Sequence, residues 1–197
     1  MALTLRQKAL KILYPLFIWA SKKTTKIQQL NNKKMINSPV SFYTLSATLN
    51  DGKELSFEKL KGKKVLIVNT ASDCGYTPQY AELQKLYENA KEEVEIIAFP
   101  ANDFKEQEKG TDQDIAAFCS RNYGVTFPLA KKSVVVKGNE QHPVFQWLTN
   151  KSLNGWNDKE PSWNFSKFLI NEEGVLAAYF EPSVSPLSTD VTTAVHS

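Results

Sequence analysis

The most restrictive feature of this 197-residue chain is a run of β-forming apolar residues that leads into a helix. Residues 64–72, KVLIVNTAS, are nearly continuous in such residues, which is typical of a strand buried on both faces. Residues 77–90 follow, with Thr77 as a helix N-cap, Pro78 at the first helical position and apolar residues at helical spacing. A second apolar run, VEIIAFP at 94–100, comes next. The segment therefore predicts a right-handed β–α–β unit with parallel strands.

The remaining elements complete one α/β domain. We expect them in this order: a hairpin at 40–63 that turns at Asn50-Asp51-Gly52, a capped helix at 111–124, a short strand at 133–137, a helix at 142–150 and a terminal hairpin at 165–180. Strand–helix–strand–helix followed by a helix and an antiparallel hairpin is the order of a thioredoxin-like sandwich. Helices then flank a mixed central sheet, and the early hairpin lies at the N-terminal side of the domain.

Charge is distributed unevenly along the chain. The formal net charge is +3, from 24 basic and 21 acidic residues. The first 50 residues hold eight of the basic residues and no acidic one, which leaves 16 basic against 21 acidic residues in the remainder. A mildly acidic domain argues against a nucleic-acid partner, whereas the basic leader favours an anionic surface.

Residues 1–38 are expected to form a basic leader with a polar linker, ahead of the domain at 39–197. The apolar stretch Ile12–Ala20, broken by Pro15, is too short to cross a bilayer, which needs about 20 apolar residues. Aromatic residues and flanking lysines favour contact of residues 1–34 with a membrane surface, away from core and site. A short signal peptide and an ordinary tail are the alternatives, so the location is cytoplasmic, membrane-associated or exported.

Cys74 lies between the buried strand and the helix that follows it. The chain has only two cysteines and two histidines, without a C-x-x-C pair or zinc-ligand spacing, so a metal site is not expected. Cys74 precedes the expected N-cap Thr77 by three residues, and the free N–H groups at a helix start favour the thiolate, the nucleophilic form. Flanking Asp73 and Gly75 argue against burial. Position alone favours a reactive cysteine over a small buried apolar one.

Four stretches of the sequence resemble the glutathione peroxidase family in its cysteine-containing form. They are VNTASDCGYTPQYAELQKLY (68–87), FPANDFKEQEKG (99–110), FCSRNYGVTFP (118–128) and WNFSKFLI (163–170). The similarity runs in order from about Val40 to the C-terminal region. It implies an antioxidant enzyme that reduces hydrogen peroxide and organic or lipid hydroperoxides through a cysteine sulfenic acid. The resemblance also implies no bound cofactor, and thioredoxin or glutathione as the external thiol reductant.

The resemblance assigns site residues one by one. The nucleophile falls on Cys74, the catalytic glutamine on Gln107, and the tryptophan and asparagine on Trp163 and Asn164. Amide and indole N–H groups are neutral donors, so they stabilise an anion without titrating. A second Trp-Asn pair, Trp156-Asn157, lies in an expected loop, whereas Trp163-Asn164 runs directly into a strand that can hold it rigidly.

Two departures from the family pattern bear on the mechanism. Ala101 stands where many relatives have cysteine, which leaves Cys119 as the candidate resolving cysteine. Cys119 also follows Ile115 and Phe118 at helical spacing, which fits a buried core residue equally well. Residues 149–162 are short where tetrameric relatives carry an insertion, which implies a monomer with an open site.

Two other functions use the same residues. A peroxide sensor would pass its oxidation to a partner protein without rapid turnover, and nothing in the sequence separates it from an enzyme. A membrane-tethered thiol–disulfide oxidoreductase is the third hypothesis, and the missing C-x-x-C pair argues against it.

Overall fold

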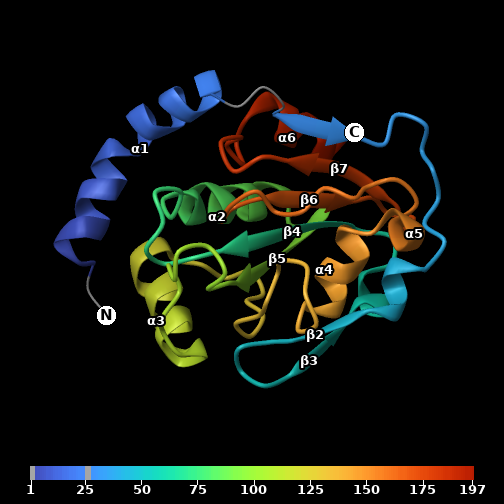
Figure 1. The fold of residues 1–197 in the computed structure, drawn as a ribbon, viewed down its shortest axis with the longest axis horizontal. Coiled ribbons are helices and arrows are strands. Elements are labelled where there is room, and N and C mark those ends of the chain that lie inside the picture. The colour runs from blue at the N-terminus through green and yellow to red at the C-terminus, as the bar shows by residue number, and fades with distance from the viewer. Residues whose placement is uncertain (1–2, 25–27) are drawn as a thin grey trace.

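The computed structural model describes residues 3–24 and 28–197, and its centre is a five-stranded mixed sheet (Figure 1). The strands lie in the order β1, β7, β6, β4, β5. Their bounds are β1 (Gln29–Asn31), β4 (Lys64–Thr70), β5 (Val94–Pro100), β6 (Lys167–Ile170) and β7 (Leu176–Phe180). Strands β4 and β5 are parallel, whereas the pairs β4–β6, β6–β7 and β1–β7 are antiparallel. The predicted parallel β–α–β unit and terminal hairpin are therefore both confirmed.

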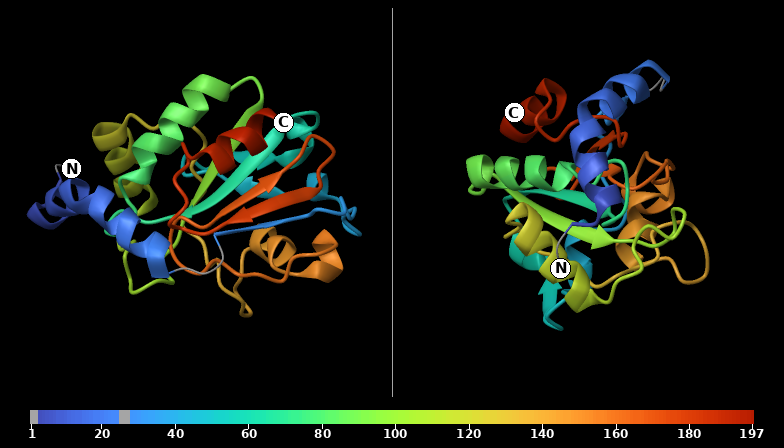
Figure 2. Two further views of the ribbon diagram at one scale, coloured as in Figure 1. Left: turned by 90° about the horizontal axis from the view of Figure 1, so that it is seen from above. Right: turned by 90° about the vertical axis from the view of Figure 1, so that its left-hand side faces the viewer.

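Helices cover both faces of the sheet, as expected for a thioredoxin-like sandwich (Figures 1 and 2). One hydrophobic cluster lies between the sheet and the helices α2 (Gln79–Ala90), α3 (Asp112–Tyr123) and α6 (Thr189–His196). The other lies under α4 (Pro143–Leu148) and the 3-10 turns η1 (Phe42–Thr44) and η2 (Phe57–Leu60), with α5 (Lys151–Asn154) beside it. Alternate residues of β4 enter the two clusters, which explains why its whole length is buried.

Local sequence patterns predicted several boundaries well. The early hairpin forms from β2 (Ser46–Thr48) and β3 (Glu54–Ser56) around the expected turn. Helix α3 begins with a capping box between Thr111 and Asp114 and ends at Gly124, whose φ is +64°. The strand predicted at 133–137 is wrong. The segment forms only an isolated bridge, between Val134 and Gln141, because the Val135 N–H donates to Asp103 Oδ2 at 2.9 Å and the Lys137 N–H donates to Glu160 Oε2 at 3.0 Å.

The start of α2 differs from the prediction. The helix begins at Gln79, and Thr77 is not its N-cap. Instead, the Thr77 hydroxyl donates to the Ala71 carbonyl at 2.9 Å and accepts from the Cys74 N–H at 3.0 Å. The Thr77 side chain therefore stabilises the loop between β4 and α2 instead of capping the helix.

The N-terminal region is more ordered than a leader and linker. Helix α1 (Leu5–Thr24) continues through Pro15, where a break was expected, because Tyr14 and Ile18 on either side of the proline pack against the domain. Strand β1 pairs with β7, so part of the expected linker belongs to the sheet. Within residues 3–24 and 28–197, no helix combines the length and apolar character needed to cross a bilayer.

Candidate active site

Cys74 lies in a tight loop after β4 and is completely buried. Besides the bond from Cys74 N–H to Thr77, the Thr77 N–H donates to the Cys74 carbonyl at 3.1 Å, and the Tyr76 N–H points to Sγ at 3.4 Å. These bonds turn the cysteine inward, into the cluster under α2 and α3, with 0% of its surface exposed. The expectation that Asp73 and Gly75 would keep Cys74 exposed is therefore wrong.

Burial also controls the protonation of the thiol. Desolvation raises the pKa of Cys74 to about 11, although the Tyr76 N–H, the Trp163 indole and the Asn164 amide all act to lower it. The neighbouring Asp73 carboxylate raises the pKa further. The lowered pKa expected from a nearby helix start is not found, because α2 begins later than predicted and the cost of burial is larger. The resting form is the thiol, surrounded by donors that favour the anion.

The other predicted site residues come from distant segments and meet beside Cys74. Asn164 is fully buried, and its Nδ2 donates to Gln107 Oε1 at 3.1 Å, across 57 positions of sequence. The Gln107 carbonyl accepts from the Asp73 N–H at 3.1 Å, which fixes the glutamine segment to the cysteine loop. The Trp163 carbonyl accepts from Asn69 Nδ2 at 3.0 Å, at the end of β4. The structure thus brings all four predicted residues together.

Strained backbone flanks two of these residues. Lys105 and Glu106, directly before Gln107, have φ of +54° and +52°, and Phe165, directly after Asn164, has φ of +69°. Such values are unfavourable for residues other than glycine and tend to occur at functional sites. None of these positions is a glycine, so their residue types do not predict a positive φ.

Buried Lys167 supports the strained turn at Phe165. Its Nζ donates to the Phe165 carbonyl at 2.8 Å, and the Phe165 N–H donates to the Asn69 carbonyl at 2.6 Å. Desolvation lowers the pKa of Lys167 to about 7. Lys167 was not among the predicted site residues, although a lysine within the apolar run FSKFLI is a signal of a buried functional or structural group.

Glu108 is a second buried group that was not among the predicted site residues. Its carboxyl accepts from the Ser72 hydroxyl at 3.0 Å, and its N–H donates to Asn102 Oδ1 at 2.9 Å. Burial raises its pKa to about 7. The residue therefore joins the Gln107 segment to the loop that carries Cys74.

The second Trp-Asn pair has a structural position instead. The Trp156 indole donates to the Leu176 carbonyl at 2.7 Å, and Asn157 Nδ2 donates to the Leu148 carbonyl at 2.7 Å. Trp156 packs against the cluster under α4, on the face of the sheet opposite to the one that holds Cys74. The geometry separates the two pairs clearly.

Cys119 lies in α3 and belongs to the same hydrophobic cluster as Cys74. It is fully buried, and both cysteines are free thiols. Burial raises the pKa of Cys119 to about 12, with a smaller opposing effect of the Tyr80 hydroxyl.

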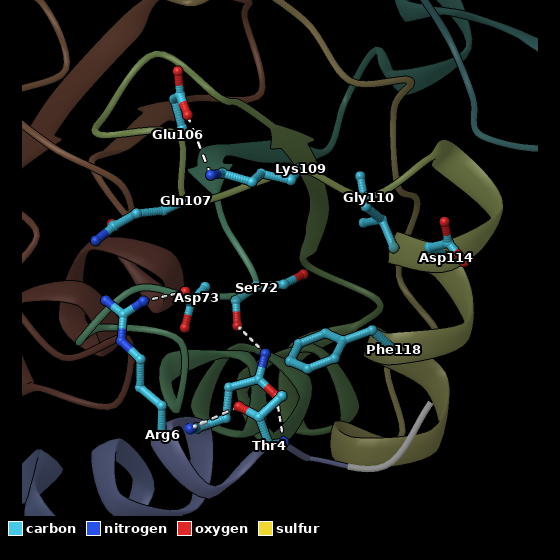
Figure 3. A pocket seen from close by; sticks show the side chains of 12 residues that line it. Thr4, Arg6, Ser72, Asp73, Glu106, Gln107, Lys109, Gly110, Asp114 and Phe118 are labelled. Carbon is cyan, nitrogen blue, oxygen red and sulfur yellow. Dashed lines mark hydrogen bonds and ion pairs between the residues drawn. The ribbon is translucent and has the colours of Figure 1, made fainter.

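A cavity of about 450 Å³ opens next to Gln107, and α1 forms one of its walls (Figure 3). Arg6 makes an ion pair with Asp73, and Gln7 Nε2 donates to the Ser72 carbonyl at 3.0 Å. Phe118 of α3 also lines the cavity (Figure 3). The expectation that residues 1–34 touch neither core nor site is therefore wrong, because α1 contacts the two residues that precede Cys74.

Fold and site together define a class of protein: a thioredoxin-fold protein whose single loop cysteine is surrounded by neutral hydrogen-bond donors. The family model described as glutathione peroxidase matches residues 42–149. A glutathione peroxidase homolog, BsaA, of Halalkalibacterium halodurans is 47% identical over 149 residues, which cover 75% of this chain and 94% of that protein. The glutathione peroxidase-like peroxiredoxin HYR1 of Saccharomyces cerevisiae is 45% identical over 152 residues, 77% of this chain and 93% of that one.

A solved structure agrees with these sequence matches. The crystal structure of Trgpx in apo form has a TM-score of 0.61 and 30% identity, over 81% of this chain and 98% of that chain. The chain belongs to the glutathione peroxidase family. It is a thiol-dependent peroxidase, and neither the sensor nor the disulfide-exchange hypothesis is favoured.

Proposed function

We propose that Cys74 is the peroxide-reducing nucleophile and that Gln107, Trp163 and Asn164 are its supporting donors. The observation that carries this proposal is the convergence of the indole and amide groups on Sγ, reinforced by the bond between Asn164 and Gln107. Neutral donors held in place stabilise a thiolate and a developing oxyanion without titrating themselves.

The chemistry follows from this arrangement. The thiolate of Cys74 attacks one oxygen of the hydroperoxide, forming an S–O bond as the O–O bond breaks. The leaving alkoxide or hydroxide takes up a proton and departs as alcohol or water, and the cysteine becomes a sulfenic acid. Two thiol equivalents from the reductant then return Cys74 to the thiol and release water and a disulfide. The protein itself supplies no redox cofactor in this scheme.

The test is the rate of Cys74 oxidation by hydrogen peroxide in a stopped-flow experiment. Cys74→Ser should abolish peroxide reduction while the fold persists, since a serine hydroxyl is a poor nucleophile at neutral pH. Gln107→Ala should slow oxidation by roughly 10- to 1000-fold, the range for loss of one preorganised donor. Substantial turnover by the Cys74→Ser variant would refute the assignment.

The reductant is a separate part of the proposal. Thioredoxin would act if Cys119 resolves the sulfenic acid, and glutathione would act if Cys74 works alone. A disulfide needs Cα atoms within about 7 Å. Cys74 and Cys119 lie on different elements, so we expect resolution to involve a shift or unwinding of α3 after oxidation. Shared membership of one cluster supports Cys119 as the resolving residue.

Cys119→Ser separates the two routes. We expect this variant to keep the first oxidation step and lose most turnover with thioredoxin. Disulfide mapping after one equivalent of peroxide gives an independent answer, since a Cys74–Cys119 bond supports thioredoxin and a glutathione adduct supports glutathione. Normal thioredoxin-dependent turnover of the variant would make Cys119 a core residue only.

The proposal includes the state of the whole molecule. The short segment 149–162 supports a monomer, which sedimentation velocity tests directly. Residues 1–38 form a basic leader ahead of the domain at 39–197 in this proposal, with β1 as the attachment of the leader to the sheet, and residues 1–34 are the region that contacts a membrane surface. A dimer or tetramer at micromolar concentration would contradict the proposed monomer.

A further inference from the structure

Helix α1 has apolar side chains on two opposite faces. The inner face holds Tyr14 and Ile18, which pack against the cluster under α2 and α3, and Gln7, which bonds to the Ser72 carbonyl. Residues 7, 14 and 18 share one side of a helix with 3.6 residues per turn. The domain covers this inner face, because α1 runs past the end of the sheet where β4 and β5 finish (Figures 1 and 2).

The outer face is apolar and exposed. Leu5, Ile12, Leu13 and Leu16 are 86%, 77%, 52% and 65% exposed. Among the described residues, half of the exposed large hydrophobic side chains therefore lie on this one helix. A contiguous exposed apolar surface of this kind marks an interaction site.

Charge decides which partner fits the outer face. Lys8 and Arg6 lie on the two flanks of the apolar stripe, and no acidic residue occurs in the first 50 positions. A second copy of the chain would bring two basic helices together, which like-charge repulsion opposes. An anionic lipid surface instead offers both a hydrocarbon boundary for the stripe and phosphate groups for the basic flanks.

We propose that the outer face of α1, centred on Leu5, Ile12 and Leu16, docks on an anionic lipid bilayer with the helix axis parallel to the surface. The stripe from Leu5 to Leu16 is about 18 Å long, at 1.5 Å rise per residue. Since Gln7 on the inner face contacts Ser72 and Arg6 on the flank pairs with Asp73, docking holds the cysteine loop near the lipid surface. This inference rests on the membrane contact proposed for residues 1–34 and assigns it to one face of α1, and its consequence for substrate access rests on the proposed role of Cys74.

The experiment uses the full chain and vesicles made either of phosphatidylcholine alone or of equal parts phosphatidylcholine and phosphatidylglycerol. Co-sedimentation should show binding to the anionic vesicles and much weaker binding to the neutral ones. The double variant Ile12→Glu with Leu16→Glu should weaken anionic binding by at least about tenfold. The matched control, Met35→Glu with Leu187→Glu, changes the net charge equally at exposed apolar positions outside α1 and should weaken binding by about twofold at most.

Three outcomes would overturn the inference. They are absence of binding to anionic vesicles, equal losses in the two double variants, and a wild-type dimer in sedimentation velocity that the α1 variant dissociates. The last result would assign the stripe to a second copy of the chain. The oxidation of Cys74 by hydrogen peroxide is measured without vesicles in both double variants, which separates the docking test from the test of the peroxidase proposal. Unchanged oxidation rates would show that a failure of docking leaves the peroxidase proposal intact.

Discussion

The buried thiol of Cys74 makes the peroxide reaction depend steeply on pH, and Asn164 should set part of that dependence. A pKa of about 11 leaves the thiol protonated below that value. Only about 1 in 10,000 molecules then carries the thiolate at pH 7, and this fraction rises about tenfold for each pH unit up to the pKa. Because the thiolate is the nucleophile, the rate of oxidation should rise in parallel.

Asn164→Ala removes one of the donors that favour the anion. A hydrogen bond to a charged group contributes about 1.5–3 kcal/mol, and one pKa unit corresponds to about 1.4 kcal/mol. The variant should therefore have a pKa of Cys74 about one to two units higher and an oxidation rate about 10- to 100-fold lower at pH 8. The bond from Asn164 to Gln107 is lost as well, so the larger value is expected if the glutamine also moves.

The assay is stopped-flow oxidation by hydrogen peroxide, with iodoacetamide alkylation of Cys74 across pH 6–10 as a second measurement. A Cys119→Ser background ensures that only one thiol reacts. Asn139→Ala, at an exposed asparagine, is the control and should match wild type. Wild-type alkylation that is independent of pH between 7 and 9 would refute the idea that burial sets the pKa. Equal profiles for Asn164→Ala and wild type would remove the asparagine from the site.

Three further predictions concern other parts of the structure. Trp163→Phe should slow the oxidation of Cys74, whereas Trp156→Phe should leave the rate unchanged. Trp156→Phe should instead lower the free energy of unfolding by about 0.5–1.5 kcal/mol, because one hydrogen bond is lost. Equal effects of the two variants on oxidation would mean that the wrong Trp-Asn pair was assigned to the site. The pKa of Lys167 is lowered to about 7 in the folded protein, so between about pH 7 and 10 the unfolded chain binds a proton that the folded chain does not. The free energy of unfolding should therefore rise with pH in this range, and Lys167→Met should flatten the rise in urea titrations. An equal dependence of the unfolding free energy on pH in the variant and the wild type would contradict this prediction. Arg6→Gln removes the ion pair with Asp73, whose carboxylate raises the pKa of Cys74, and should slow oxidation about two- to fivefold at pH 8. Lys8→Gln removes a positive charge without breaking that ion pair and should leave the rate unchanged. Similar rates for the two variants would mean that solvent fully screens the Arg6–Asp73 ion pair.

The sequence by itself determined the elements whose patterns are local. Strand β4 is a continuous apolar run because both of its faces are buried, and the α3 boundaries follow from a capping box and a glycine at the C-cap. The four stretches of family resemblance also predict Cys74, Gln107, Trp163 and Asn164 as site residues. These features are recognisable because spacing and residue type are enough to define them.

Tertiary structure alone decided the environment of those residues. The pKa of Cys74 depends on desolvation by distant segments, so a helix start nearby could not predict its direction. Phe165 takes a strained conformation between Lys167, which donates to its carbonyl, and Asn69 of β4, which accepts from its N–H, and the bond to Asn69 is long-range. The contact of Arg6 with Asp73 spans 67 positions, so the sequence pattern of the N-terminal region does not indicate that α1 forms one wall of the cavity beside the site. Burial and long-range hydrogen bonds depend on which segments meet in space, and the residue pattern of one segment does not contain that information.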